Sequence, residues 1–366
     1  MKIGYFAPPA PARTGVADYA AALLPYLRRF SPVEPGARHA DIRLYHLGNN
    51  QLHREIYREA LERPGVGVLH DAVLQHFFLG SLDEAAYVEE FVYNYGEWHR
   101  GLALEMWRRR AGSGLGARYF ACPMLKRVAE RSLALVVHNP AAARMVREHA
   151  PAARVFEIPH LYEPSPAPGA REIFAFRARL CIAPGDFVFG LFGYLRETKR
   201  VIPVLRAFEA VRRTVPGCIL LIAGEFVSRD LARAAEPLLR RPGVVRVPYL
   251  KAADFRLAIA SVDLCLNPRY PAAGETSGIT VRAMGAGKPV IVTAGEENAR
   301  WPEDACLRAD PGPAEGAALC DHMILGLRFP GVARAAGRCA AAYIAREHAP
   351  ERVAERYWKA LCECRC

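Results

Sequence analysis

Several sequence signals that often reveal a protein's class are missing from this chain of 366 residues. Its apolar runs stay well below the ~20 residues of a membrane-spanning helix, which argues against an integral membrane protein. The chain opens on strand-like residues without the layout of a secretory signal, so we expect no leader. Walker A, Gly-x-Ser-x-Gly and His-Glu-x-x-His patterns are absent, which argues against P-loop nucleotidases, serine hydrolases and zinc proteases.

Lysine is scarce as well, since six of the 49 basic residues are Lys and 43 are Arg. Lys199 and Lys288 are therefore conspicuous, because both fall inside motifs described below. The net charge of +11 suits a phosphate-bearing ligand or an anionic membrane surface. Recognised nucleic-acid motifs and a dense basic stripe are both absent, so we expect no nucleic acid partner.

Cysteine occurs ten times, but never as Cys-x-x-Cys. Cys218 and Cys265 lie in apolar strand-like runs, which is typical of reduced cysteines used as small apolar side chains in the cytoplasm. The tail residues Cys362, Cys364 and Cys366 lack nearby His partners, so we predict no metal site. We expect a cytoplasmic protein, with a peripheral contact on the inner face of the membrane as an alternative.

Strand-like runs alternate with helical patterns in both halves of the chain, which predicts parallel α/β sheets. The length fits two domains of roughly 150–200 residues each. In the first half we expect strands at Ile3–Ala7, Ile42–Leu47, Val66–His70 and Leu133–His138. In the second half we expect them at Phe187–Phe192, Cys218–Ala223, Val244–Val247, Leu264–Asn267 and Val290–Thr293. Between Phe30 and Ile42, a strand that such folds usually have is expected to be missing.

These patterns divide the chain into four segments. Residues 1–161 are expected to form a Rossmann-like domain with a helical insertion at 76–120, and residues 172–345 a second one. The Pro-rich stretch 162–171 between them is typical of a linker. Residues 346–366 contain an amphipathic final helix. The insertion is rich in aromatic and basic residues. Three interpretations of it remain open: an acceptor groove, a membrane contact, or ordinary packing as core and surface.

The most informative stretch is Leu264–Thr293, where an apolar strand leads through an acidic loop into a short helix. Ser277 or Thr276 can cap the helix start, and Gly278 lets a ligand approach the backbone. The free N–H groups of a helix start favour an anion such as a diphosphate. Glu275 cannot help to hold an anion, so we expect it to accept hydrogen bonds from sugar hydroxyls. A loop that binds phosphate and hydroxyls together indicates a nucleotide-sugar site.

The same stretch resembles the donor-site signature of GT-B glycosyltransferases of family 4, the group 1 transferases. In that signature an acidic residue precedes a second Glu, which is followed by Ala-Met and Gly-x-Pro-Val-Ile. Glu275 matches the first acid, and Ala283-Met284 through Ile291 match the end. Arg282 stands where the family has the second Glu, a residue that typically contacts the ribose. The resemblance implies two Rossmann-like domains facing across a cleft, with the final helix crossing back onto the first domain.

A second motif, Phe192 to Arg200, follows the first strand of the second domain. Gly193 allows a tight exit from the strand, and Lys199 and Arg200 open the next helix. In family 4 the matching loop carries an Arg and a Lys that hold the donor diphosphate, and Lys199 falls on that Lys. Tyr194 occupies the Arg position, so Arg196 or Arg200 is expected to replace the charge. A solvated basic helix start is the alternative.

Two loops of the first domain are expected to face the same cleft. Gly15 lies in the turn after the first strand, where a glycine allows close approach to a ligand. His70 and Asp71 end another strand, and the His could contact the donor sugar or orient the acceptor hydroxyl, with Asp71 orienting the His. Alternatively, His70 is a satisfied strand-end residue and Asp71 an N-cap. His138 and Asn139 end a further strand in the same way.

The resemblance implies a retaining glycosyltransferase that moves a sugar from a nucleotide-diphosphate donor to a saccharide or lipid-linked saccharide. No Asp-x-Asp occurs, which argues against the metal-dependent GT-A type. The nucleotide sugar is a substrate, and no cofactor is expected. The predicted catalytic residues are His70, Asp71 and Glu275. The predicted donor-binding residues are Gly15, Gly193, Arg196, Lys199, Arg200, Glu275, Thr276, Ser277, Gly278 and Arg282.

Two other functions remain open. A nucleotide-sugar epimerase on the same fold would need further carboxylates in the cleft besides Glu275. A non-catalytic scaffold derived from a transferase would explain why Tyr194 and Arg282 replace an Arg and a Glu. The sequence leaves the base, the sugar and the acceptor undetermined, because these depend on the shape of the pocket.

Overall fold

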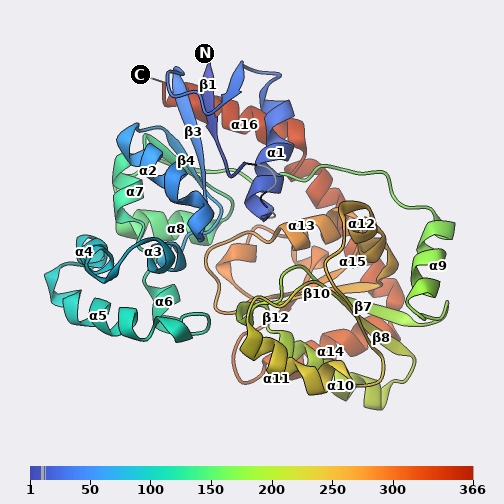
Figure 1. Ribbon diagram of the computed structural model, residues 1–366. Helices are drawn as coiled ribbons and strands as arrows, with labels where there is room; N and C mark the ends of the chain where they lie inside the picture. Colours follow the sequence, from blue (N-terminus) through green and yellow to red (C-terminus); the bar gives the residue numbers. More distant parts are fainter. Residues whose placement is uncertain (10–11, 13, 366) are drawn as a thin grey trace.

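The computed structural model describes residues 1–9, 12 and 14–365, and it forms two α/β domains (Figure 1). Each domain is built on a six-stranded parallel sheet. The strand order is β2-β1-β3-β4-β5-β6 in the first sheet and β12-β11-β10-β7-β8-β9 in the second. The predicted α/β class with two Rossmann-like domains is confirmed.

The first domain contains the segments up to β6. Its strands are β1 (Ile3–Phe6), β2 (Val33–Pro35), β3 (Ile42–Leu47), β4 (Val66–Leu69), β5 (Ala134–Val137) and β6 (Val155–Glu157). Its helices are α1 (Gly15–Leu27), α2 (Arg54–Glu62), α3 (Gln75–Ser81), α4 (Glu84–Tyr95), α5 (Arg100–Arg108), α6 (Ala117–Ala121), α7 (Lys126–Arg131) and α8 (Pro140–His149).

The second domain contains the later strands and most of the later helices. Its strands are β7 (Phe187–Phe192), β8 (Cys218–Ala223), β9 (Val244–Val247), β10 (Leu264–Asn267), β11 (Val290–Thr293) and β12 (Leu307–Ala309). The helices from the linker onward are α9 (Ala170–Arg179), α10 (Val201–Thr214), α11 (Arg229–Leu239), α12 (Ala252–Ser261), α13 (Gly278–Gly285), α14 (Glu315–Arg328), α15 (Pro330–Glu347) and α16 (Pro350–Glu363).

The central strands are continuous apolar runs because helices cover both faces of each sheet. β8 reads CILLIA, and five of its six residues are buried. On one face of the second sheet lie side chains such as Val188 and Leu221, and on the other lie Phe189 and Leu220. Because successive side chains of a strand point to opposite faces, the sheet contributes to two separate apolar layers, one on each face.

The expectation of a missing strand between Phe30 and Ile42 is wrong. β2 occupies this stretch and pairs in parallel with β1, with Val33 opposite Ile3. Only Val33 of its three residues is buried, and the strand ends in Pro35 at the edge of the sheet. A strand with one apolar residue leaves no periodic signal in the sequence, which is why the pattern missed it.

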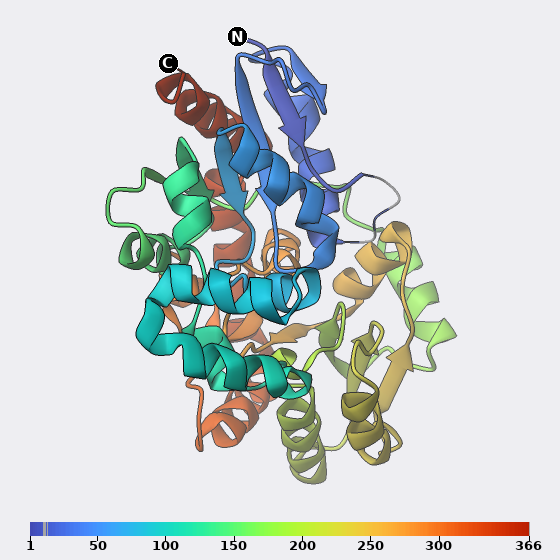
Figure 2. The ribbon, with the colours of Figure 1, turned by 60° about the vertical axis from the view of Figure 1, so that its left-hand side comes forward.

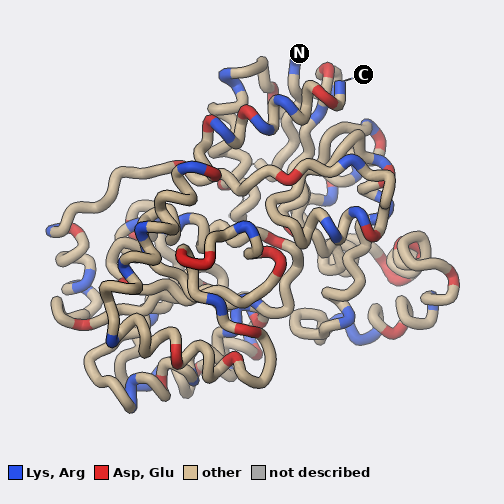
Figure 3. The backbone as a smooth tube through the Cα atoms, turned by 180° about the vertical axis from the view of Figure 1, so that it is seen from behind, with Lys and Arg blue, Asp and Glu red and all other residues tan. Residues whose placement is uncertain are grey.

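The helical insertion forms an extension of the first domain, seen as α3 to α6 at the lower left of Figure 1 and in front in Figure 2. Its aromatic residues pack inward, because Tyr87, Phe91 and Trp107 are buried in the core beneath β4 and β5. Acidic and basic positions are interspersed along both domains (Figure 3). Most of the aromatic character of the insertion thus belongs to its core, although Trp98 is almost fully exposed.

The chain passes between the domains twice, at the linker and at the junction of α15 and α16. Tyr162 donates its backbone N–H to His348 O at 2.9 Å, and His348 Nδ1 donates to His160 O at 2.5 Å. The two crossings therefore lie side by side. Beyond them α16 packs along α1, where the Tyr19 and Tyr357 hydroxyls are 3.0 Å apart (Figure 1). Residue 366, at the end of the predicted final segment, lies outside the described residues.

Tyr357 is fully buried between α16 and the first domain, so it provides a test of this packing. We expect Tyr357→Ala to lower the free energy of unfolding by about 3–5 kcal/mol, because it removes a large buried ring. Tyr357→Phe should cost only about 1 kcal/mol, since it loses just the hydrogen bond to Tyr19. Urea unfolding measures both values. Equal stability of Tyr357→Ala and the wild type would show that α16 contributes nothing to the first domain.

Candidate active site

A cleft of about 1510 Å³ lies between the two domains. Its walls are the loops at the carboxyl ends of the strands, which is where open parallel sheets place their ligands. The structure brings most of the predicted residues together here. Those that line the cleft are Gly15, His70, Asp71, Gly193, Arg196, Lys199, Glu275, Thr276, Gly278 and Arg282.

Ser277 does not line the cleft, but it supports the helix start that does. Its Oγ accepts the N–H of Thr280 at 3.3 Å and so caps α13. Asn267, the last residue of β10, donates to Ser277 Oγ at 2.8 Å and to Thr280 Oγ1 at 2.6 Å. The hydrogen bonds of Asn267 thus fix the start of α13 to the end of β10. Gly278, in the first turn of this helix, lines the cleft. The positive end of the dipole of α13 and the free N–H groups of its first turn therefore face the cleft.

The carboxylate of Glu275 is held in place by its own domain. Arg269 donates to Glu275 Oε1 at 2.6 Å, and the backbone N–H of Ala273 donates to Oε2 at 2.7 Å. Arg269 also reaches Ser277 Oγ at 3.3 Å. Sequence reasoning missed Arg269, and the only available signal was a basic residue just past the end of β10. It brings a further positive charge to the donor side of the cleft.

Lys199 is a buried cation, only 5% exposed, and its Nζ donates to the carbonyl of Phe192. Gly193 makes room for it, because a Cβ at this position would lie 3.0 Å from the ammonium nitrogen. Burial lowers the pKa of Lys199 well below its usual value, and nearby Arg269 and Arg196 lower it further. An anion bound beside Lys199 would favour its charged form again.

Arg200 is not among the residues that line the cleft. Its backbone is left-handed at φ 55°, and its guanidinium forms an ion pair with Glu315 of α14, with Nε 2.8 Å from Oε2. Glu315 is buried, so this pair serves to join α10 to α14. Arg196 lines the cleft and is therefore the better of the two predicted replacements for the family Arg.

Arg282 reaches across the cleft, with a terminal nitrogen 3.9 Å from a carboxylate oxygen of Asp18 on α1. Both side chains are about half exposed. A pair of this kind in water contributes little stability. Asp18 lies in the first turn of α1, which begins at Gly15, and Arg282 lies in the last turn of α13, so this pair joins the start of one helix to the end of the other.

His70 and Asp71 have partners other than those predicted. His70 Nε2 lies 3.0 Å from His46 Nδ1, and the Asp71 carboxylate accepts the N–H of Asn49 at 2.9 Å. His46 therefore orients His70, a role expected for Asp71. Burial raises the pKa of Asp71, and the charge of Glu275 raises it further. Carboxylates of both domains thus face the same part of the cleft.

Histidines gather behind the first-domain wall of the cleft. The ring of Tyr19 is surrounded at centroid distances of 4.7–6.0 Å by those of His46, His70, His138 and His160. Burial lowers the pKa of His46 to about 3 and that of His138 to about 4. The cluster is therefore uncharged at neutral pH.

Three further observations bear on the predicted ligands and location. Within residues 1–9, 12 and 14–365, no group of three or more His, Cys, Asp or Glu side chains is arranged to hold a metal ion. The nine cysteines of the described chain are all free thiols, and Cys366 lies outside it. Among the described helices, none combines the length and apolar character needed to cross a bilayer.

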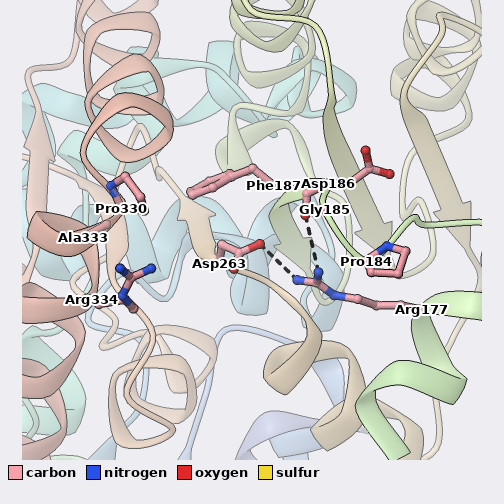
Figure 4. Close-up of a pocket in the computed structure, with 9 residues that line it drawn as sticks. All are labelled: Arg177, Pro184, Gly185, Asp186, Phe187, Asp263, Pro330, Ala333 and Arg334. Atoms are coloured by element: carbon pink, nitrogen blue, oxygen red, sulfur yellow. Dashed lines mark hydrogen bonds and ion pairs between the residues drawn. The ribbon is translucent and has the colours of Figure 1, made fainter. Parts of the chain in front are cut away.

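A smaller pocket of about 200 Å³ lies at the other end of β7, away from the cleft (Figure 4). Arg177 of α9 points into it and donates to the carboxylate of Asp263 at 3.0 Å and to the carbonyl of Ser261 at 2.6 Å. The N–H of Val188 also donates to Asp263, at 2.8 Å. These bonds attach α9 to the beginning of the sheet, so we assign this pocket a structural role.

Residues 186–323 match the family model described as glycosyl transferases group 1. The match runs from the start of β7 into α14 and includes Lys199, Glu275 and α13. No curated protein matches the sequence.

Solved structures resemble the whole chain. HepE of Anabaena in complex with UDP-glucose has a TM-score of 0.71 at 14% identity, covering 99% of this chain and 100% of that one. Sucrose-phosphate synthase from Thermosynechococcus elongatus has a TM-score of 0.59 at 16% identity, covering 87% and 73%. TarM of S. aureus reaches 0.59 at 13%, covering 94% and 59%. The chain has the GT-B fold. Together with the family match, this fold supports a GT-B glycosyltransferase.

The buried histidines predict a pH dependence of stability. Burial lowers the pKa of His46 to about 3 and those of His53, His138 and His348 to about 4, from 6.5. The unfolded chain takes up protons below pH 6.5 while the folded chain does not. The free energy of unfolding should therefore fall as the pH drops from 7 to 5.5, with each histidine approaching about 1.4 kcal/mol per pH unit.

Urea unfolding at several pH values measures this slope. His46→Gln should reduce the proton uptake on unfolding by about one, and His53→Gln provides a second variant should the first fail to fold. A stability that stays constant between pH 7 and pH 5.5 would contradict the expectation.

Proposed function

We propose that this chain is a retaining glycosyltransferase that uses a nucleotide-diphosphate sugar. The observation that carries the proposal is the cluster of Lys199, Arg196 and Arg269 beside the capped start of α13. These groups offer buried and partly buried positive charge together with free backbone N–H groups, which is what a diphosphate requires. HepE, which resembles this chain over its full length, has been crystallised with UDP-glucose. A UDP-sugar is therefore the first donor to test.

Glu275 is the residue proposed to hold the donor sugar. Its carboxylate is fixed by Arg269 and Ala273 at the cleft wall and can accept hydrogen bonds from sugar hydroxyls. Arg282 replaces the Glu of the family signature, so ribose recognition in this chain has to rely on other groups. Asp18, which lies 3.9 Å from Arg282, offers a carboxylate in that part of the cleft.

In the proposed reaction the bond between the sugar C1 and the leaving phosphate oxygen breaks, and a bond from C1 to the acceptor oxygen forms on the same face. The acceptor proton passes to the leaving phosphate. The protein holds the reactants together and stabilises charge on that phosphate through Lys199, Arg196 and the start of α13. His70, kept uncharged by burial, and Asp71 face the donor from the first domain.

The acceptor, a saccharide or lipid-linked saccharide, is proposed to bind along the first domain. There Asn49, His76 and Phe120 line the cleft, which offers amide and imidazole groups and an aromatic face. We propose that the nucleotide sugar is consumed as a substrate, without a metal or cofactor. The free cysteines favour a cytoplasmic location, with any contact to the membrane being peripheral.

Calorimetric titration with UDP, GDP and ADP tests the donor site. We expect one nucleotide to bind the wild type, and Lys199→Met to weaken its binding by about tenfold to a hundredfold, because a charge-assisted hydrogen bond is lost. Lys359→Ala, on the exposed side of α16, is the matched control and should bind as the wild type does. A chain that folds but binds none of the three nucleotides would favour the non-catalytic scaffold.

Glu275→Gln separates binding from transfer. The amide keeps the size of the side chain but accepts hydrogen bonds more weakly, so we expect sugar transfer to fall roughly tenfold to a hundredfold. The affinity for the nucleotide should change little, since Glu275 faces the sugar and not the phosphates. Release of nucleotide from the donor sugar measures the rate. Inversion of the C4 or C2 centre of the sugar, without release of nucleotide, would instead point to an epimerase.

A further inference from the structure

A single buried amide joins the two domains at the loop that carries Glu275. Asn139 lies two residues beyond the end of β5 and is 2% exposed. Its Oδ1 accepts the N–H of Ala142 at 2.9 Å and thereby caps α8. Its Nδ2 donates to Gly274 O at 2.9 Å and to Thr276 Oγ1 at 3.0 Å. The oxygen of this amide therefore bonds within the first domain, while both N–H groups donate to the second domain.

The neighbouring backbone reinforces the contact. Ala72, two residues beyond His70, donates its N–H to Ala273 O at 2.8 Å. Gly274 has φ +68°, and a Cβ there would lie 2.7 Å from Ala72 Cβ and 3.2 Å from Met145 Sδ. The first domain thus packs directly on the backbone of this loop, at a position that only a glycine tolerates without strain.

Glu275 lies between the two residues that Asn139 holds. Its carboxylate accepts the N–H of Ala273, whose carbonyl in turn accepts from Ala72. A displacement of the loop would therefore move the carboxylate with it. Any opening of the cleft has to break the bonds from Asn139 and Ala72 before the domains can part.

We propose that Asn139 is a positioning residue that couples closure of the cleft to the placement of the Glu275 carboxylate. The inference rests on the proposed function, in which Glu275 holds the donor sugar. Asn139 does not contact the substrate. It acts through the loop, by giving the carboxylate one position when the two domains are together.

Asn139→Ser separates the two tasks of this side chain. A serine is as good a helix N-cap as asparagine, so α8 keeps its cap. The shorter hydroxyl cannot supply the two donors that reach Gly274 and Thr276. Asp83→Ser is the matched control, since Asp83 caps α4 of the helical insertion by accepting the N–H of Ala86 at 2.8 Å and lies outside the cleft.

The first readout is hydrolysis of UDP-glucose, followed as release of UDP, together with calorimetric binding of UDP. For Asn139→Ser we expect kcat to fall about tenfold to a hundredfold, because a small misplacement of a positioning group has effects of this size. The dissociation constant of UDP should stay within about twofold of the wild-type value, since Lys199 and the start of α13 are unchanged. Unaltered kcat, or an equal loss in Asp83→Ser, would overturn the proposal.

The second readout needs no substrate. Amide hydrogen exchange in the free protein should be faster in Asn139→Ser than in the wild type for peptides that contain Ala72 and residues 273–276. Equal exchange in these peptides would show that Asn139 does not hold the loop. If the wild type neither binds nucleotide nor hydrolyses UDP-glucose, the proposed function fails, and the exchange measurement still decides whether Asn139 couples the domains.

Discussion

Parallel pairing of the strands is the constraint on which the site depends. When all strands of a sheet run the same way, the loops that follow them collect at one edge. Here the loops after β1, β3 and β4 of one sheet meet those after β7 and β10 of the other across the cleft. His70, Lys199 and Glu275, far apart in the chain, become neighbours for this reason. Burial at that junction lowers the pKa of His70 and that of Lys199.

The cationic side chains at and near the cleft have different partners. Arg269 is paired with Glu275, and Arg200 with Glu315 outside the cleft. Lys199 donates to the backbone carbonyl of Phe192, and its pKa is lowered by burial and by neighbouring cations. Arg196, Lys199 and the start of α13 already lie at the cleft wall, so they need not move far when an anionic ligand arrives. The same groups make the empty cleft less stable than a neutral one would be.

The two domains are connected by features of different strength. The crossings at His160–Tyr162 and His348 are covalent and lie side by side, and α16 is anchored to α1 by buried apolar residues and by Tyr357. The contacts of Asn139 and Ala72 with the 273–276 loop consist of a few hydrogen bonds and close backbone packing. Hinge-like motion is expected at such paired crossings, whereas the loop contacts are ones that can form and break.

The sequence by itself determined the parts of this protein that depend on local pattern. Apolar runs predicted nine strands in two α/β domains, and the Ser277-Gly278 helix start and the Gly193 turn were found where the chain had the residues for them. The three-residue edge strands β2, β6 and β12 were missed, since so few residues carry no periodicity. Only the tertiary structure decided that Arg196 lines the cleft while Arg200 pairs with Glu315, and that His46, not Asp71, supports His70. Likewise, only the tertiary structure showed that Arg269 pairs with Glu275 and that Asn139 bonds to Gly274 and Thr276 of the other domain. The physical reason is that these roles depend on which side chains meet in the folded protein. Contacts between residues far apart in the chain produce no regular spacing in the sequence, so the sequence pattern cannot predict them.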